Sequence, residues 1–188
     1  MANGEVHAWN ILDRQPVVAK WDNGIFTDFT STTEPPAQNK WIGPPLVDLQ
    51  INGFAGVDFQ QDDLTAEQLL HATNAIGQAG CGRFFFTLIT DDWEAMTRRL
   101  AKAKQLRDAD PALGQAIAGW HIEGPFLSAE PGYCGAHPPD MMLDPTPEQL
   151  EEIREITSDD PVLLTMAPER ESGLSAFAKA RELGFRVS

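Results

Sequence analysis

The pattern of apolar and polar positions divides the chain near residue 45 into two parts with different periods. Before that point, short alternating stretches typical of β-strands are separated by the turn-forming runs Asp22-Asn23-Gly24 and Glu34-Pro35-Pro36. An Asn-Gly step between two alternating stretches is typical of a hairpin turn. We therefore predict a small β segment over residues 1–44, which packs as an appendage on the rest of the chain. Its expected strands are Glu5–Leu12, Pro16–Trp21 and Ile25–Phe29.

From residue 45 onward, short apolar runs alternate with amphipathic stretches of helical period. Thr65 with Gln68, and Thr146 with Gln149, have the spacing of capping boxes at helix starts. Arg83–Thr90 is almost continuously apolar, as in strands buried on both faces of a parallel sheet. The expected strands are Pro45–Ile51, Arg83–Thr90, Ala116–Ile122, Val162–Ala167 and Phe185–Ser188, and the expected helices are Thr65–Ala79, Asp92–Ala109, Thr146–Thr157 and Ser172–Leu183.

This alternation predicts an α/β fold of right-handed βαβ units around a parallel sheet. Residues 45–188 hold four βα units and the start of a fifth strand. A complete (β/α)8 TIM-type barrel takes roughly 250 residues, so we expect about the first half of such a barrel, as an N-terminal piece with the β appendage. An open doubly wound sheet is the weaker alternative, because no glycine-rich phosphate loop follows the first strand.

Composition and charge narrow the possible partners and the compartment. The chain has 28 acidic and 14 basic side chains, a formal net charge of −14. This excess argues against nucleic acid or an anionic membrane as a partner, although local donors can still bind a small anion. Cys81 and Cys134 form no CxxC pair, which suggests reduced thiols. Without a recognisable signal peptide or an apolar run of about 20 residues, we expect a cytoplasmic protein.

Polar residues end the first predicted strand of the barrel. In a parallel barrel the functional residues lie at the carboxyl ends of the strands. Alternation along Asp48-Leu49-Gln50-Ile51-Asn52-Gly53 places Asp48, Gln50 and Asn52 on one face, directed into the barrel mouth. The alternative is a strand end that turns through Asn-Gly and merely exposes its polar groups to water.

The third predicted strand and the loop after it carry the other candidates. His121 and Glu123 share a face at the strand end, where a glutamate can ligate a divalent metal. The alternative is an ion pair or a buried histidine with a structural role. The long loop 127–142 has the character of a lid or binding loop. Within it, His137 can donate a hydrogen bond to a substrate carbonyl or phosphate, or can simply be an exposed loop histidine.

Five motifs together resemble those of the N-acetylglucosamine-6-phosphate deacetylase family, in the amidohydrolase superfamily. They occur in the family's order and spacing over about residues 42–188: Asp48-Leu49-Gln50-Ile51-Asn52-Gly53, Thr87-Leu88-Ile89-Thr90, His121-Ile122-Glu123-Gly124-Pro125-Phe126, Gly135-Ala136-His137-Pro138 and Leu164-Thr165-Met166-Ala167-Pro168-Glu169. The resemblance implies a metal-dependent hydrolase that removes the acetyl group of N-acetyl-D-glucosamine 6-phosphate to give glucosamine 6-phosphate and acetate. It also implies a (β/α)8 barrel beside a small β domain built from both termini.

By position, the resemblance makes Glu123 the carboxylate ligand of one divalent metal ion, expected to be zinc. It makes Ala136 and His137 substrate contacts, with His137 as the catalytic residue near the N-acetyl carbonyl. Gln50 and Asn52 stand where many amidohydrolases carry the His-x-His pair of a second metal, so they are vestigial second-metal positions. In the family, two histidine ligands and the acid/base aspartate follow later strands, which would lie beyond Ser188.

Two other functions remain open from the sequence. One is an amidohydrolase that acts on another N-acyl substrate, and the other is a non-catalytic fragment or sugar-phosphate-binding module. The expected partner is a small amino-sugar phosphate, with no nucleic acid and no membrane. Because unpaired strand edges promote association, we also expect a homo-oligomer, such as a dimer, or association with the missing C-terminal half. Alone, the chain is expected to be inactive.

Overall fold

The structure is a computed structural model that describes residues 3–170 and 173–188. It separates into two compact units, Met1–Pro45 and Leu46–Ser188. The first unit is a four-stranded sheet of order β3-β2-β1-β4, made of β1 (Gly4–Asn10), β2 (Pro16–Asp22), β3 (Ile25–Ser31) and β4 (Trp41–Ile42). The predicted hairpin joins β2 to β3, with Asn23 and Gly24 both at positive φ, as a tight two-residue turn requires. β4, which the pattern does not predict, pairs in parallel with β1.

The first unit buries few apolar side chains. Ala8, Val17 and Ala19 are fully buried between its strands. Every residue of β3 is exposed, and Phe26 and Phe29 on this strand lie at the surface. The unit therefore carries much of its apolar area outside its core.

The second unit contains a parallel sheet of order β11-β10-β9-β8-β5. Its strands are β5 (Leu46–Ile51), β8 (Cys81–Ile89), β9 (Ile117–Glu123), β10 (Val162–Thr165) and β11 (Arg186–Val187). The strands lie side by side in the order in which they occur in the chain, each joined to the next through a helix. The predicted α/β fold with a parallel sheet is thus confirmed, with β5 and β11 at the two edges of the described sheet.

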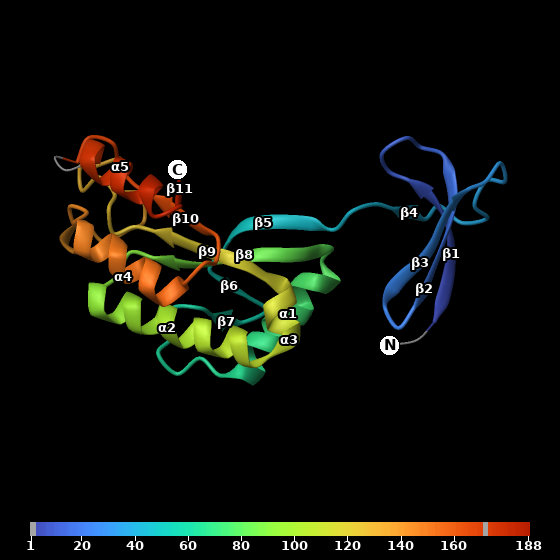
Figure 1. Cartoon of the computed structure of the whole chain (residues 1–188), viewed down its shortest axis with the longest axis horizontal. Helices are drawn as coiled ribbons and strands as arrows, with labels where there is room; N and C mark the ends of the chain where they lie inside the picture. The colour runs from blue at the N-terminus through green and yellow to red at the C-terminus, as the bar shows by residue number, and fades with distance from the viewer. Residues whose placement is uncertain (1–2, 171–172) are drawn as a thin grey trace. The chain divides into compact units, whose positions relative to one another are not determined.

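The connecting helices are α1 (Ala66–Gln78), α2 (Trp93–Ala109), α3 (Pro111–Ala116), α4 (Pro147–Thr157) and α5 (Gly173–Glu182). Helices α1 to α4 lie along one side of the sheet (Figure 1). Both predicted capping boxes are present: Thr65 caps α1 with Gln68, and Thr146 caps α4 with Gln149. The predicted start of the last helix, Ser172, lies outside the described residues.

Four short elements of the second unit are absent from the prediction. Helix α3 begins at Pro111 because Asp110 accepts hydrogen bonds from the N–H groups of Ala112 and Leu113, and proline is favourable at a first helical position. The strands β6 (Gly53–Phe54) and β7 (Val57–Asp58) form a small hairpin after β5. A single 3-10 turn, η1 (Pro139–Met141), lies in the loop after β9. All four are too short to produce a periodic apolar pattern.

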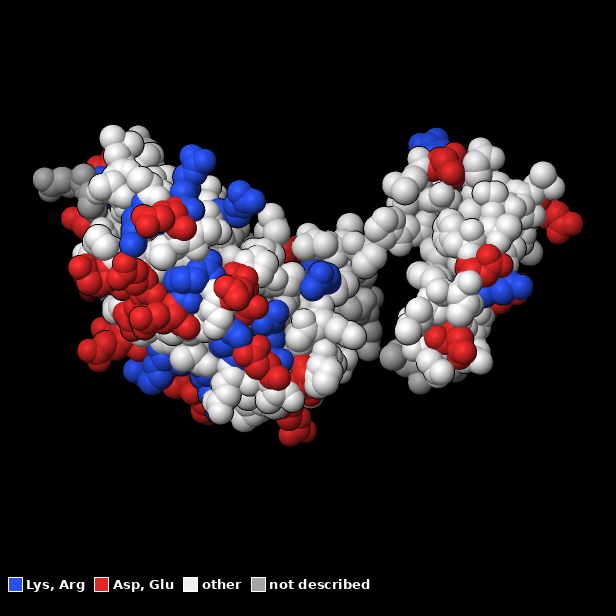
Figure 2. Space-filling model, in the orientation of Figure 1, with Lys and Arg blue, Asp and Glu red and all other residues white. Residues whose placement is uncertain are grey.

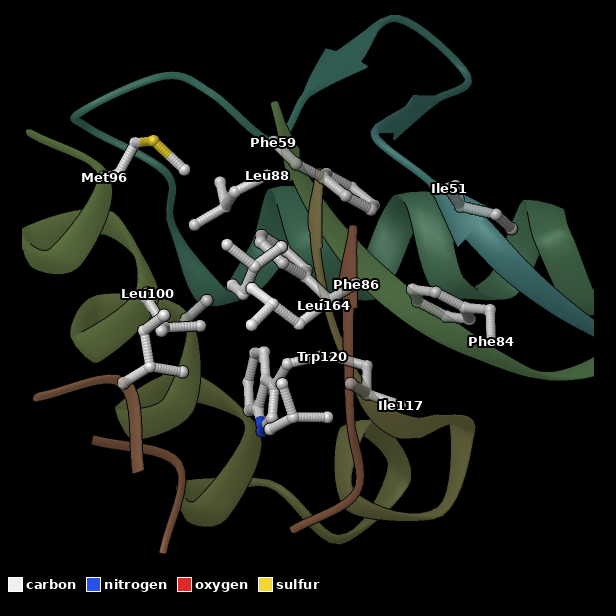
Figure 3. Close-up of a cluster of buried hydrophobic side chains, with 14 of the residues drawn as sticks. Ile51, Phe59, Phe84, Phe86, Leu88, Met96, Leu100, Ile117, Trp120 and Leu164 are labelled. Carbon is white, nitrogen blue, oxygen red and sulfur yellow. The ribbon is translucent and has the colours of Figure 1, made fainter. Parts of the chain in front are cut away.

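Alternate residues of the strands point to opposite faces of the sheet, and the face toward the helices forms the core (Figure 3). Phe86 of β8 stacks on Phe59, with ring centroids 4.5 Å apart, and meets the edge of Trp120 of β9 at 5.8 Å. On the opposite face, the same two strands present Thr87, His121 and other polar side chains. The candidate chemistry is therefore on the face without helices.

Acidic and basic side chains intermingle on the visible surface of the second unit (Figure 2). Asp160, in the turn before β10, is the centre of one such group. Its Oδ2 accepts hydrogen bonds from Trp120 Nε1 at 3.0 Å and Arg107 Nη1 at 2.8 Å, and Lys104 Nζ lies 3.5 Å away. This carboxylate therefore ties α2, β9 and the α4–β10 turn together.

Candidate functional site

Glu123 ends β9 on the helix-free face of the sheet. In register it pairs with Ile89 of β8 on one side and Thr165 of β10 on the other. Gly124 follows with φ +97°, a conformation that favours glycine, so the chain leaves the sheet immediately after the carboxylate. The Glu123 side chain is 20% exposed and is therefore reachable from solvent at the carboxyl end of the sheet.

Gln50 of β5 reaches across to this carboxylate. Its Nε2 donates a hydrogen bond to Glu123 Oε2 at 2.7 Å, although β8 lies between the two strands in the sheet. The bond occupies one carboxylate oxygen and orients the other. The structure thus brings Gln50 and Glu123 together at the edge where the resemblance puts the site.

His137 comes from the loop after β9 and faces the second carboxylate oxygen. Its Nε2 lies 3.9 Å from Glu123 Oε1, and its Nδ1 lies 2.8 Å from Thr90 Oγ1. The imidazole is 15% exposed, so it is not a freely solvated loop histidine. Gln50, Glu123 and His137 therefore form one cluster from β5, β9 and the following loop.

The other predicted positions are arranged differently. Asp48 Oδ1 accepts a hydrogen bond from the backbone N–H of Gln50, which is a local contact within β5. Asn52 is exposed, and its main-chain oxygen accepts from Phe59 N. The β5–β8 register shifts between Asp48 and Ile51, so simple alternation does not describe this strand end. Ala136 is exposed in the loop beside His137.

His121 has the structural role that the sequence left open. It is buried, with Nε2 2.8 Å from Thr165 Oγ1 and Nδ1 3.5 Å from Thr87 Oγ1. Burial holds the pKa of His121 below its ordinary value, although the charge of Glu123 acts in the opposite direction. A neutral imidazole between two threonines on neighbouring strands joins β8, β9 and β10.

The donor set for a metal ion is incomplete in the part of the chain that the structure describes. Within residues 3–170 and 173–188, no three His, Cys, Asp or Glu side chains gather closely enough to hold an ion. A catalytic zinc usually takes about three protein ligands and one water. Glu123 and the neighbouring His137 fall short of that number, so these residues do not fit a complete zinc site.

Two side chains of the site have no role in the sequence analysis. Thr90, directly after β8, holds His137 through its hydroxyl. Gln60 pairs with the backbone of Ile89, accepting from its N–H and donating to its carbonyl at 3.2 Å each. The sequence could have indicated Thr90 by its position, because it ends an apolar strand whose carboxyl end lies beside the end of the strand that carries Glu123.

Comparisons with known proteins agree with the resemblance. No protein-family model matches the chain. N-acetylglucosamine-6-phosphate deacetylases from Danio rerio and Caenorhabditis elegans are each 30% identical to it, over 163 and 154 residues. An N-acetylgalactosamine-6-phosphate deacetylase from Escherichia coli O157:H7 is 26% identical over 147 residues. The first two matches cover 80% and 78% of this chain but 37% and 36% of the relatives, so the chain spans just over a third of their length.

Solved structures show the same relationship. N-acetyl-D-glucosamine-6-phosphate deacetylase from Mycobacterium smegmatis superposes with a TM-score of 0.73 at 27% identity, over 92% of this chain and 44% of that one. The Thermotoga maritima enzyme gives 0.78 at 21% identity, over 98% and 48%. The resemblance to these deacetylases is therefore confirmed over most of this chain.

Proposed function

We propose that this chain forms part of a metal-dependent deacetylase that hydrolyses N-acetyl-D-glucosamine 6-phosphate to glucosamine 6-phosphate and acetate, within a (β/α)8 barrel. The observation that carries the proposal is the convergence of Gln50, Glu123 and His137 at the carboxyl end of a parallel sheet. Such ends are where barrel enzymes place their functional groups. The similarity to deacetylases over most of the chain supports the same function.

In this proposal Glu123 is one carboxylate ligand of a divalent ion, which we expect to be zinc. The amide of Gln50 donates to Oε2 and so leaves Oε1 for the ion. Further ligands are required for such an ion, because the described residues supply too few donors. We accordingly assign binding and positioning roles to these residues and no step at the metal.

His137 and Ala136 are proposed to contact the substrate. With Nδ1 engaged by Thr90, only Nε2 of His137 remains to face the site, where a protonated nitrogen can donate to the acetyl carbonyl. Ala136 lies next to it in the same loop and offers its backbone to the acetamide.

The 4-epimer of the sugar is a second candidate substrate. The relative named as an N-acetylgalactosamine-6-phosphate deacetylase is nearly as similar to this chain as the glucosamine enzymes are. The groups of the proposed site address the acetamide, which the two sugars share. Assays with both sugar phosphates separate these possibilities, and other N-acyl amides test a wider amidohydrolase activity.

The test of the proposal compares Glu123→Gln with Glu155→Gln in a protein that contains these residues within a complete barrel. Glu155 is an exposed glutamate of α4, on the helix side of the sheet, so its substitution makes the same charge change away from the site. Partners of metal ligands are typically worth about 10- to 100-fold, so loss of the ligand itself should lower turnover by more than about 100-fold. Bound metal and acetate release are measured for both.

We expect Glu123→Gln to lose metal and turnover and Glu155→Gln to retain both. Equal metal content and rate in the two variants would show that Glu123 is structural. His137→Ala should raise KM while the metal remains bound, and loss of metal from that variant would make His137 a ligand instead. The 188-residue chain alone is expected to release no acetate.

A further inference from the structure

We propose that Thr90 is a positioning residue that holds the neutral imidazole of His137 with its proton on Nε2, directed into the site. The significance of this arrangement for catalysis rests on the proposed function, in which Nε2–H donates to the acetyl carbonyl. The arrangement itself is a property of the folded chain.

Thr90 is placed to act on His137 and little else. It follows β8 directly and is 4% exposed, so its hydroxyl finds its partners inside the protein. Its Oγ1 lies 2.8 Å from His137 Nδ1 and 3.5 Å from the main-chain oxygen of Glu123. The first distance is that of a normal hydrogen bond, and the second is at the outer limit.

The single hydroxyl proton decides the tautomer. A threonine hydroxyl can donate only one hydrogen bond, and the closer acceptor is Nδ1. If Nδ1 accepts, a neutral imidazole must carry its proton on Nε2. The carboxylate oxygen of Glu123, 3.9 Å from Nε2, favours the same choice because it attracts an N–H and repels a lone pair.

Gly124 makes room for this hydroxyl. A Cβ on Gly124 would collide with Thr90 Oγ1, and the positive φ of Gly124 independently disfavours a side chain there. Since Thr90 is β-branched, its side chain has few rotamers in which to escape. Gly124, directly after β9, thus leaves space for the Thr90 hydroxyl beside His137 Nδ1. The two residues that this contact joins, Thr90 and His137, are 47 residues apart in the chain.

The test is histidine ¹⁵N NMR on the 188-residue chain, at a pH well above the ordinary histidine range so that the rings are neutral. The His137 resonances are identified by their loss in His137→Gln. We expect a protonated Nε2 and an unprotonated Nδ1 whose chemical shift is displaced by the hydrogen bond that it accepts. Thr90→Val, which keeps the shape without the hydroxyl, should return the Nδ1 shift toward that of free imidazole, whereas Thr90→Ser should preserve it.

A proton on Nδ1 in the wild-type chain overturns the proposal, and so does a Thr90→Val chain whose Nδ1 shift is unchanged. If Thr90→Val does not fold, the tautomer of the wild type and the Thr90→Ser spectrum still decide the matter. The measurement needs no turnover. Absence of deacetylation by a complete barrel that contains these residues would refute the proposed function and leave the Thr90 arrangement intact, whereas a proton on Nδ1 would refute the arrangement and leave the proposed function intact.

Discussion

Substitution of Asp160 is expected to destabilise the second unit more than its position in a surface turn suggests. The Trp120 side chain is fully buried, and its indole N–H has Asp160 Oδ2 as its partner. Arg107 and Lys104 contact the same oxygen with side chains that are only 14% and 17% exposed. Removing the carboxylate therefore affects three donors at once.

The magnitude can be worked out from these contacts. A buried donor left without its partner costs about 1–3 kcal/mol, and a hydrogen bond to a charged group contributes about 1.5–3 kcal/mol. The full sum of these contributions is not lost, because Arg107 still donates to Ile117 O and Lys104 still pairs with Asp108. We expect Asp160→Ala to lower the free energy of unfolding by about 2–4 kcal/mol, and Asp160→Asn, which keeps an acceptor oxygen, by about half as much.

Urea denaturation at neutral pH measures both variants against Asp159→Asn. The adjacent Asp159 is exposed, so the same loss of charge there should change stability by less than about 0.5 kcal/mol. Adding Trp120→Phe completes a double-mutant cycle that isolates the indole contact. If Asp160→Ala is no more destabilising than Asp159→Asn, the group centred on Asp160 does not stabilise the fold.

The contribution of Asp160 to the free energy of unfolding depends on pH, with a sign that follows from the direction of its pKa shift. Burial raises the pKa of Asp160, but the Trp120 hydrogen bond and the charges of Arg107 and Lys104 outweigh burial and hold the pKa below its usual value. A carboxyl whose folded-state pKa is lowered stabilises the protein above its unfolded pKa of about 3.9, and this stabilisation is lost as the pH falls through the folded-state value. The difference between wild type and Asp160→Asn should therefore shrink in acid.

Two further predictions concern the core and an ion pair. Phe86→Ala removes a buried ring stacked on Phe59 and should lower the free energy of unfolding, measured by urea denaturation, by about 3–5 kcal/mol. Phe85→Ala, on the other face of the sheet, should lower it clearly less, and equal losses in the two variants would contradict the assigned core. The hydrogen bond from Arg99 lowers the pKa of Asp91 more than any other interaction does. Asp91→Asn should therefore destabilise the protein at neutral pH and progressively less below about pH 4, and a stability difference from wild type that stays constant with pH would refute this linkage.

Most of the order of elements could be predicted from the sequence because their signals are local. The capping boxes at Thr65 and Thr146 involve residues three apart, and the turn at Asn23-Gly24 depends on the backbone freedom of two residues. Strand-helix alternation likewise indicates a parallel sheet without knowledge of any long-range contact. Candidate side chains such as Glu123 could be found because parallel strands present their carboxyl ends at one edge.

The contacts within the site were decided by the tertiary structure alone. Gln50 and Glu123 are 73 residues apart, and His137 and Thr90 are 47 residues apart, so no local pattern encodes their hydrogen bonds. The shifted register of β5 likewise replaces the expected alignment of Asp48, Gln50 and Asn52. Periodicity is set by the backbone within a few residues, whereas register depends on how whole strands pack against one another and against the helices. The sequence by itself therefore determined the main helices and strands and the edge of the sheet where the candidate residues lie, and packing decided which side chains meet there.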